Sequence, residues 1–380
     1  MCFISKGSYG SVFKPAFESL TLTDFGIITV GKIFKHAIDE KDEHKNNMIM
    51  KKLDKHNQFT VPYFGIHKII LDDDTIETLK AAGLRKRRQL VYSYGGISLE
   101  KYMRIRSDQT SPIPIPFLTI LKNLKPVVAG ILLMQKRGYC HADIKPANMV
   151  MDDYGVIKLI DFGIMTSFEN LSSNDIIMSA PYAYYPVELL LIDYYRAMKI
   201  KYECLQEELD AEFQRIIAAE IQFIMEVIDH KSANSTSNTN SSYKPPFPYQ
   251  SDNQIHSRYA EYKEISKTFR EMYTSGNKGC TVQYLHELTT DKSLNNSLYK
   301  TLLIHMSGSD QSLGKLIDPY SFAISILMVY YHVRYNPLFI PESDKEEVND
   351  FVNKMLLPMV HLNPMKRLSL SKAYHRFYKI

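Results

Sequence analysis

Short runs of apolar and β-branched residues, separated by polar turns, fill the first part of the chain. Their alternation predicts strands. They lie at residues 1–12, where a glycine-bearing turn divides two strands, and at 29–34, 64–71 and 90–94. Residues 39–53 instead set apolar side chains among charged ones at helical spacing. The opening segment is therefore expected to be a small β-rich region around one helix.

Helical patterns dominate after Gly95 and Gly96. The apolar run 117–138 predicts one helix. It ends in Lys136, Arg137 and Gly138, which are typical of a helix C-terminus. Residues 196–230 predict a long amphipathic helix, and 254–273 a second, charged one. Between these two, residues 232–242 are Ser, Asn and Thr apart from one Ala, and we expect the tract 231–243 to be disordered because it cannot bury enough apolar surface.

Composition sets broad limits on these elements. The chain has 380 residues, of which 45% are hydrophobic, enough for one large or two smaller cores. A net charge of +4 gives no reason to expect direct nucleic-acid binding. The four cysteines are far apart and suggest neither a disulfide framework nor a zinc site.

Targeting signals are also not recognised in the sequence. The N-terminus has no basic-then-apolar pattern, and the longest apolar stretch, 321–331, is judged too short to span a bilayer. We therefore expect an intracellular, cytoplasmic protein with no membrane partner.

The most informative segment runs from His141 to Gly163. Asp143 and Asn148 lie five residues apart, and Asp161-Phe162-Gly163 follows thirteen residues after Asn148. The residues between read strand, turn, strand, with the turn at 152–155. Such a hairpin would bring Asn148 and Asp161 together at one end, where both could hold Mg²⁺ on a nucleotide.

This ordered set resembles the catalytic core of eukaryotic-type Ser/Thr protein kinases. The resemblance implies ATP and Mg²⁺ as cofactors and an α+β, bilobal fold. The small lobe would comprise residues 1–94 and the mainly helical lobe 95–192 and 312–380, with an insertion at 193–311. The sequence looks closest to divergent kinases of large DNA viruses and, more distantly, to casein kinase 1, so its location could be host cytoplasm or virion.

The resemblance also assigns the phosphate-binding residues. Ser5, Gly7, Gly10 and Val12 match a Gly-rich loop whose first glycine is replaced by Ser5. Lys32 matches the lysine that pairs with the α and β phosphates. Its rival is Lys35, and the small residue Gly31 directly before Lys32, expected under the adenine, favours Lys32. Glu40 and Glu43 are both candidates to hold the lysine, and Glu43 is preferred.

Three further positions would enclose the adenine. Tyr92 would close the back of the pocket, Tyr94 would lie in the hinge, and Val150 would face Val12 across the base. Val12 and Val150 could equally be ordinary core residues.

Catalytic roles follow from the same resemblance. Asp143 would accept or orient the proton of a substrate hydroxyl, and Asn148 and Asp161 would bind metal. Lys145 resembles the lysine that Ser/Thr kinases place beside the transferred phosphate. Ala142 replaces the arginine that pairs with an activation-loop phosphate in the family, so activity is expected not to need that phosphate. The hydroxyls available in this loop are Thr166, Ser167, Ser172, Ser173 and Ser179.

Motifs near the end of the chain extend the resemblance. The segment 185–188 resembles the close of the activation segment, and Arg367 resembles the distant arginine that pairs with Glu188. Asp318 resembles the start of the central helix. The insertion between them could dock a substrate or partner, or be a tolerated surface excursion.

Two rival functions remain open. A pseudokinase scaffold is suggested by Ser5 and Ala142, although Lys32, Asp143 and the metal-binding pair are present. A small-molecule kinase is the other, and Lys145 and Arg367 favour protein substrates instead.

Overall fold

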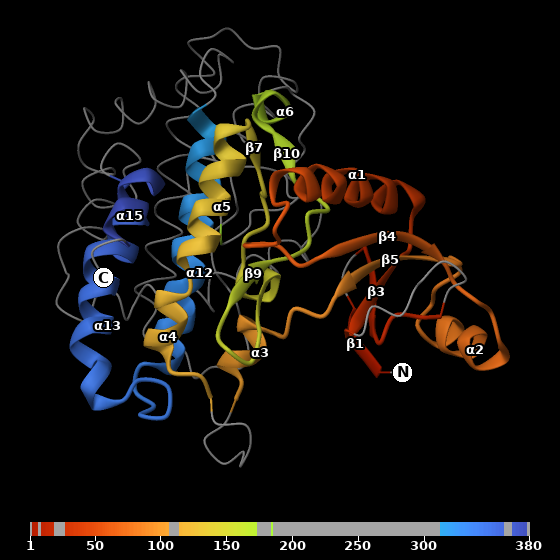
Figure 1. The fold of residues 1–380 in the computed structure, drawn as a ribbon, viewed down its shortest axis with the longest axis horizontal. Helices are drawn as coiled ribbons and strands as arrows, with labels where there is room; N and C mark the ends of the chain where they lie inside the picture. Colours follow the sequence, from red (N-terminus) through yellow and green to blue (C-terminus); the bar gives the residue numbers. More distant parts are fainter. Residues whose placement is uncertain are drawn as a thin grey trace, which may run out of the picture. The chain divides into compact units, whose positions relative to one another are not determined.

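The computed structural model of the chain describes residues 2–6, 9–18, 27–105, 114–172, 184, 312–360 and 367–377. Described residues within 1–137 and 141–165 form one unit, and those within 138–140 and 166–379 form a second. Figure 1 shows the helices and strands of the chain, coloured along the sequence.

A five-stranded sheet with the order β1-β2-β3-β5-β4 opens the first unit. All its neighbouring strands are antiparallel. The strands are β1 (Cys2–Lys6), β2 (Gly10–Lys14), β3 (Thr29–Phe34), β4 (Tyr63–Lys68) and β5 (Arg88–Ser93). They confirm the strands predicted from apolar alternation, with β1 and β2 divided at the expected turn.

The two faces of this sheet bury different side chains, because successive residues of a strand point to opposite sides. Ile33 belongs to a cluster with Phe13 and Leu79, whereas Phe34 belongs to one with Leu90, Tyr92 and Val150. Lys32 therefore shares a face with Phe34 and Val30.

Gly31 faces the other way, so the expectation that it lies under the adenine is wrong. A Cβ on Gly31 would lie 2.1 Å from Gln89 Oε1. Gln89 is fully buried and binds the backbone of Phe17 twice, accepting from its amide at 3.0 Å and donating to its carbonyl at 2.5 Å. Gly31 is small because this amide crosses beside it.

Two helices accompany the sheet. The predicted helix is α1 (Ala37–Leu53), and α2 (Asp73–Ala81) was not predicted. The signal for α2 was present in the sequence: Asp72 accepts a hydrogen bond from the Thr75 amide at 2.7 Å, as an N-cap does, and acidic residues fill the first turn.

The predicted hairpin is present. β8 (Met149–Met151) pairs with β9 (Ile157–Leu159) and with β6 (Ile97–Ser98). In the turn, Asp152 Oδ1 accepts from the amides of Tyr154 and Val156, both at 2.9 Å. The short helix α3 (Leu99–Met103) follows β6, and a 3-10 turn, Pro146–Asn148, precedes β8.

The single helix predicted over 117–138 is instead two, α4 (Phe117–Lys122) and α5 (Lys125–Lys136). Pro126 explains the break. It has no amide hydrogen to donate and its ring would clash with the carbonyl of the preceding turn, so it is accommodated in the first turn of a new helix.

The second unit contains a two-stranded sheet of β7 (Tyr139–Cys140) and β10 (Thr166–Ser167). Its helices are α6 (Phe168–Ser172), α12 (Ser312–Val333), α13 (Lys345–Phe351), α14 (Leu357–Met359) and α15 (Leu370–Arg376). A 3-10 turn, Glu342–Asp344, precedes α13, and a π-helical turn, Val352–Leu356, follows it.

α12 begins at Ser312, earlier than the start expected at Asp318. Pro319 therefore lies inside the helix rather than in its first turn, and buried Ile317 belongs to the added turns. The Arg367 guanidinium lies 4.9 Å from the centre of the Tyr320 ring. The segment 185–188, the insertion 193–311 with its helices and polar tract, Ser173 and Ser179 lie outside the described residues.

Two apolar helical stretches within the described residues reach membrane-spanning length. By length and composition alone, residues 117–136 and 314–333 could each cross a membrane. Of their most apolar windows, 50% and 83% of the residues are buried. The prediction that every apolar stretch is too short to span a bilayer is therefore wrong. Such stretches are weak indicators of a membrane span, since buried core helices meet the same criteria.

We expect Gly96→Ala to destabilise the first unit. Gly96 has φ +101°, and a Cβ would lie 1.9 Å from the Met151 carbonyl oxygen. The free energy of unfolding in urea should fall by more than about 2 kcal/mol.

Gly65→Ala is the matched control for this prediction. Gly65 has φ +112° but nothing within 4 Å of its Cβ position, so this variant should pay only the backbone strain, about 1 kcal/mol. Equal losses for the two variants would contradict the predicted clash.

Candidate active site

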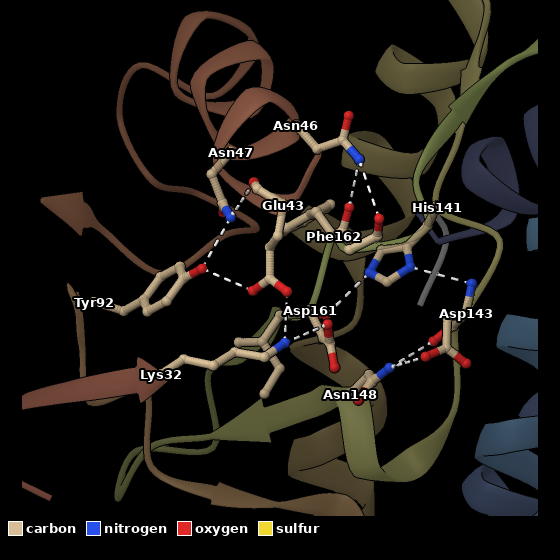
Figure 2. A network of polar contacts seen from close by, with 12 residues as sticks. Lys32, Glu43, Asn46, Asn47, Tyr92, His141, Asp143, Asn148, Asp161 and Phe162 are labelled. Carbon is tan, nitrogen blue, oxygen red and sulfur yellow. Dashed lines mark hydrogen bonds and ion pairs between the residues drawn. The ribbon is translucent and has the colours of Figure 1, made fainter. Parts of the chain in front are cut away.

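One buried lysine links three segments of the first unit. Lys32 Nζ on β3 lies 2.6 Å from Glu43 Oε2 on α1 and 2.8 Å from Asp161 Oδ1, which follows β9 (Figure 2). The side chains of Lys32 and Glu43 are 13% and 3% exposed, and that of Asp161 is 36% exposed. Of the two glutamates considered from the sequence, Glu43 is thus the partner. Glu40 instead pairs with Arg88 at 2.8 Å.

The charges in this cluster depend on one another. Burial lowers the pKa of Lys32, but the carboxylates of Asp161 and Glu43 outweigh it, and the net pKa lies above its ordinary value. Burial raises the pKa of Glu43 to about 7 although Lys32 opposes the shift. Burial also disfavours ionised Asp161, but the nearby Lys32 ammonium wins and lowers its pKa. Asp161 is therefore an ionised, half-exposed carboxylate.

His141 connects the two ends of the motif through the backbone. Its Nε2 lies 3.1 Å from the Ile160 carbonyl, and its Nδ1 accepts from the Asp143 amide at 3.3 Å. Because Nδ1 accepts, Nε2 is the ring nitrogen left to donate to the Ile160 carbonyl. Ala142 and Asp161 have φ of +63° and +65°, a conformation that is uncommon for residues other than glycine and is concentrated at functional sites.

Asp143 is held by two donors on the same oxygen. Its Oδ2 accepts from Asn148 Nδ2 at 2.7 Å and lies 3.0 Å from Lys145 Nζ. Asn148 Nδ2 also donates to the Asp143 carbonyl at 2.9 Å. Among the described residues, Asp143 Oδ1 and Asn148 Oδ1 accept no hydrogen bond, so both remain available for a ligand.

The available oxygens are of the kind that Mg²⁺ prefers. Asn148 Oδ1 and the second carboxylate oxygen of Asp161 are hard ligands, and the hydrogen bond from Ile160 N to the Asn148 carbonyl (3.0 Å) holds their segments together. Within the described part of the chain, no group of three or more His, Cys, Asp or Glu side chains is arranged to hold a metal. The residues therefore fit an ion that takes its other ligands from phosphates and water.

The residues expected around the adenine all lie within the described part of the chain. Val150 is 7% exposed and packs with Tyr92 and Val30, and the Tyr94 amide donates to the Ile28 carbonyl at 2.8 Å. Val12 is half-buried on β2, opposite Lys32 in the adjacent strand.

The expected Gly-rich turn is described only at its edges. Gly10 is packed so closely that a Cβ would lie 2.3 Å from the Ile33 carbonyl oxygen. Ser5 is described only through its backbone pairing with Val12, and Gly7 lies outside the described residues.

Tyr92 was considered from the sequence, but its contacts and the roles of Asn46 and Asn47 were not predicted. The Tyr92 hydroxyl donates to Glu43 Oε1 at 2.8 Å and accepts from Asn47 Nδ2 at 3.0 Å. Asn46 Nδ2 donates to the carbonyls of Phe162 at 2.8 Å and Met165 at 3.0 Å. The available signal was the spacing: Asn46 and Asn47 are three and four residues after Glu43, on the same helical face.

This geometry agrees with the comparison to known protein families. Residues 4–204, just over half of the chain, match the family described as "Protein kinase domain". The chain belongs to the protein kinase family.

The individual relatives are distant, and each match covers only part of both proteins. The chain is 25% identical over 195 residues to "Serine/threonine-protein kinase pakH" of Dictyostelium discoideum, covering 50% of this chain and 33% of that protein. It is 25% identical over 170 residues to "Protein kinase MCK1" of Saccharomyces cerevisiae, covering 44% and 40%. The chain thus spans between a third and two fifths of the curated relatives it matches.

We expect Tyr92→Phe to weaken the cluster around Lys32. The change leaves Glu43 Oε1 without its donor and removes the acceptor of the Asn47 amide. The free energy of unfolding should fall by about 1–3 kcal/mol, and ATP affinity, measured by calorimetry, should fall with it.

Tyr102→Phe is the control for this change. Tyr102 is likewise a buried tyrosine, and its hydroxyl donates to the Ile115 carbonyl at 2.7 Å, away from the cluster. It should lose similar stability while ATP affinity stays unchanged. Equal ATP affinity in both variants would show that Tyr92 has no influence on the site.

Proposed function

We propose that this chain is an ATP- and Mg²⁺-dependent Ser/Thr protein kinase. The observation that carries the proposal is Lys32 held between Glu43 and Asp161, with Asp143 and Asn148 on the adjoining segment. The relatives' names support protein substrates with Ser or Thr acceptors. No contact among the described residues favours a scaffold or a small-molecule kinase.

Each side chain has a distinct task in this proposal. Lys32, fixed by Glu43, would bind the α and β phosphates, and Asn148 Oδ1 with Asp161 would hold the metal. Mg²⁺, when bound, supplies charge neutralisation at the phosphates. The free Oδ1 of Asp143 would orient the acceptor hydroxyl and take up its proton, since Oδ2 is already engaged by Asn148 and Lys145.

The proposal extends to regulation and cellular context. Ala142 is 4% exposed and has no charge to pair with a loop phosphate, which supports activity without loop phosphorylation. We also propose that the two lobes divide at residue 94 and that a partner docks through 193–311. The proposal further includes a cytoplasmic location, no nucleic-acid or membrane partner, and a relation to viral kinases.

The central test is Asp143→Asn. Loss of the carboxylate that accepts the proton should lower kcat by about 10²–10⁴-fold. The assay is transfer of labelled γ-phosphate to a generic basic protein in the presence of Mg²⁺.

Asp153→Asn is the matched control, because Asp153 is exposed in the β8–β9 turn. It should keep the activity of the original chain. If Asp143→Asn transferred phosphate as fast as this control, the proposed role of Asp143 would be wrong.

The acceptor class has its own test. The Lys145 ammonium lies 3.0 Å from Asp143 Oδ2, and in this proposal it would meet the phosphate beside the acceptor. Phosphoamino-acid analysis of the products should find phosphoserine and phosphothreonine, and Lys145→Ala should lower their yield together. Phosphotyrosine as the main product would contradict the assignment.

A further inference from the structure

The buried face of α1 is unusually polar. Its buried side chains are Glu40, Glu43, Asn46, Asn47 and Met50, of which only the last is apolar. Apolar contact is non-directional and tolerates small displacements, whereas buried polar groups need partners at defined positions. The place of α1, and with it the place of Glu43, is therefore set largely by hydrogen bonds and ion pairs.

Asn46 makes the bonds from this face to the segment after Asp161. Its Nδ2 lies 2.8 Å from the Phe162 carbonyl, 3.0 Å from that of Met165 and 3.5 Å from that of Gly163, and the residue is 8% exposed (Figure 2). Carbonyl oxygens that converge in this way accept hydrogen bonds but cannot donate them. A side-chain amide at position 46 can donate to them, whereas an apolar group or a carboxylate cannot.

The carbonyls belong to one turn. The Met165 amide donates to the Phe162 carbonyl at 3.1 Å, so Asn46 holds both ends of the turn that begins directly after Asp161. Asp161 itself has φ +65°. A residue in this uncommon conformation persists where its surroundings fix it, and the turn bound by Asn46 is its immediate neighbour.

Asn47 fixes the same helix toward the sheet. Its Nδ2 lies 2.8 Å from the Glu43 carbonyl and 3.0 Å from the Tyr92 hydroxyl, which donates to the Glu43 carboxylate. α1 is thus tied to β5 through one asparagine and to the metal-binding segment through the next. Neither tie involves Lys32.

We propose that Asn46 is a positioning residue that couples the place of α1 to the conformation of residues 161–165. Through this coupling, contacts within the chain assemble Lys32, Glu43 and Asp161 in the geometry that phosphoryl transfer needs. The catalytic part of this inference rests on the proposed kinase function, whereas the coupling itself does not.

Three substitutions at Asn46 separate hydrogen bonding from packing. Asn46→Gln keeps the donor on a longer arm, Asn46→Leu replaces it with an apolar group of similar size, and Asn46→Asp places a carboxylate against the carbonyls. We expect kcat to decrease in the order Gln, Leu, Asp. The loss for Leu should be about tenfold, with the KM for the protein acceptor unchanged.

Hydrogen exchange supplies a readout that does not need activity. The amides of residues 161–165 should exchange faster in Asn46→Leu and Asn46→Asp, while the amides of β3 and β5 stay protected. Met48→Asp, which adds a carboxylate on the exposed side of α1, should leave both kcat and exchange unchanged.

Several outcomes would overturn the coupling. One is exchange and kcat within about twofold of the original chain in all variants, less than half a kcal/mol of effect. Another is equal behaviour of Asn46→Gln and Asn46→Leu. If Asn46→Asp does not fold, the comparison of Asn46→Gln with Asn46→Leu alone tests the coupling. If the original chain transfers no phosphate, the proposed function fails, and hydrogen exchange alone still tests the coupling.

Discussion

The first unit depends on one ammonium group shared by two carboxylates. Lys32 lies between Glu43 and Asp161, and the three residues come from a strand, a helix and the segment that follows a hairpin. Without the lysine, two acidic groups would face each other in a poorly solvated space, and Glu43, whose pKa burial already raises to about 7, would take up a proton. The contact joins β3, α1 and the segment after β9, and in the proposed function the nucleotide phosphates and the metal would be bound around it.

The elements that position this cluster could be predicted from local sequence. Apolar alternation located β3 at its observed bounds, and the turn residues 152–155 located the hairpin that brings Asn148 and Asp161 to one end. Spacing within the His141–Gly163 motif identified the side chains that converge. Such features follow from the alternation of apolar and polar residues in strands and from the residue types of turns, which a single sequence displays directly.

Other features depend on contacts between distant residues and could not be predicted in this way. The face of Gly31 is decided by Gln89, fifty-eight positions further along the chain, and Asn46 meets carbonyls more than a hundred positions away. A helix of charged and amide residues gives a weak apolar pattern, so the sequence did not reveal which polar side chains α1 buries. By contrast, α2 and the division at Pro126 could have been predicted. The N-cap of α2 and the helix-breaking proline are both visible in the sequence but were overlooked.

The contact between Gly31 and Gln89 has an evolutionary consequence. Gln89 cannot move aside for a larger residue at position 31, because both ends of its amide are bound to the Phe17 backbone. A methyl group at 31 becomes tolerable only when a shorter side chain occupies 89 and the segment around Phe17 finds other support. The two positions should covary among homologues, with glycine at one accompanying glutamine at the other.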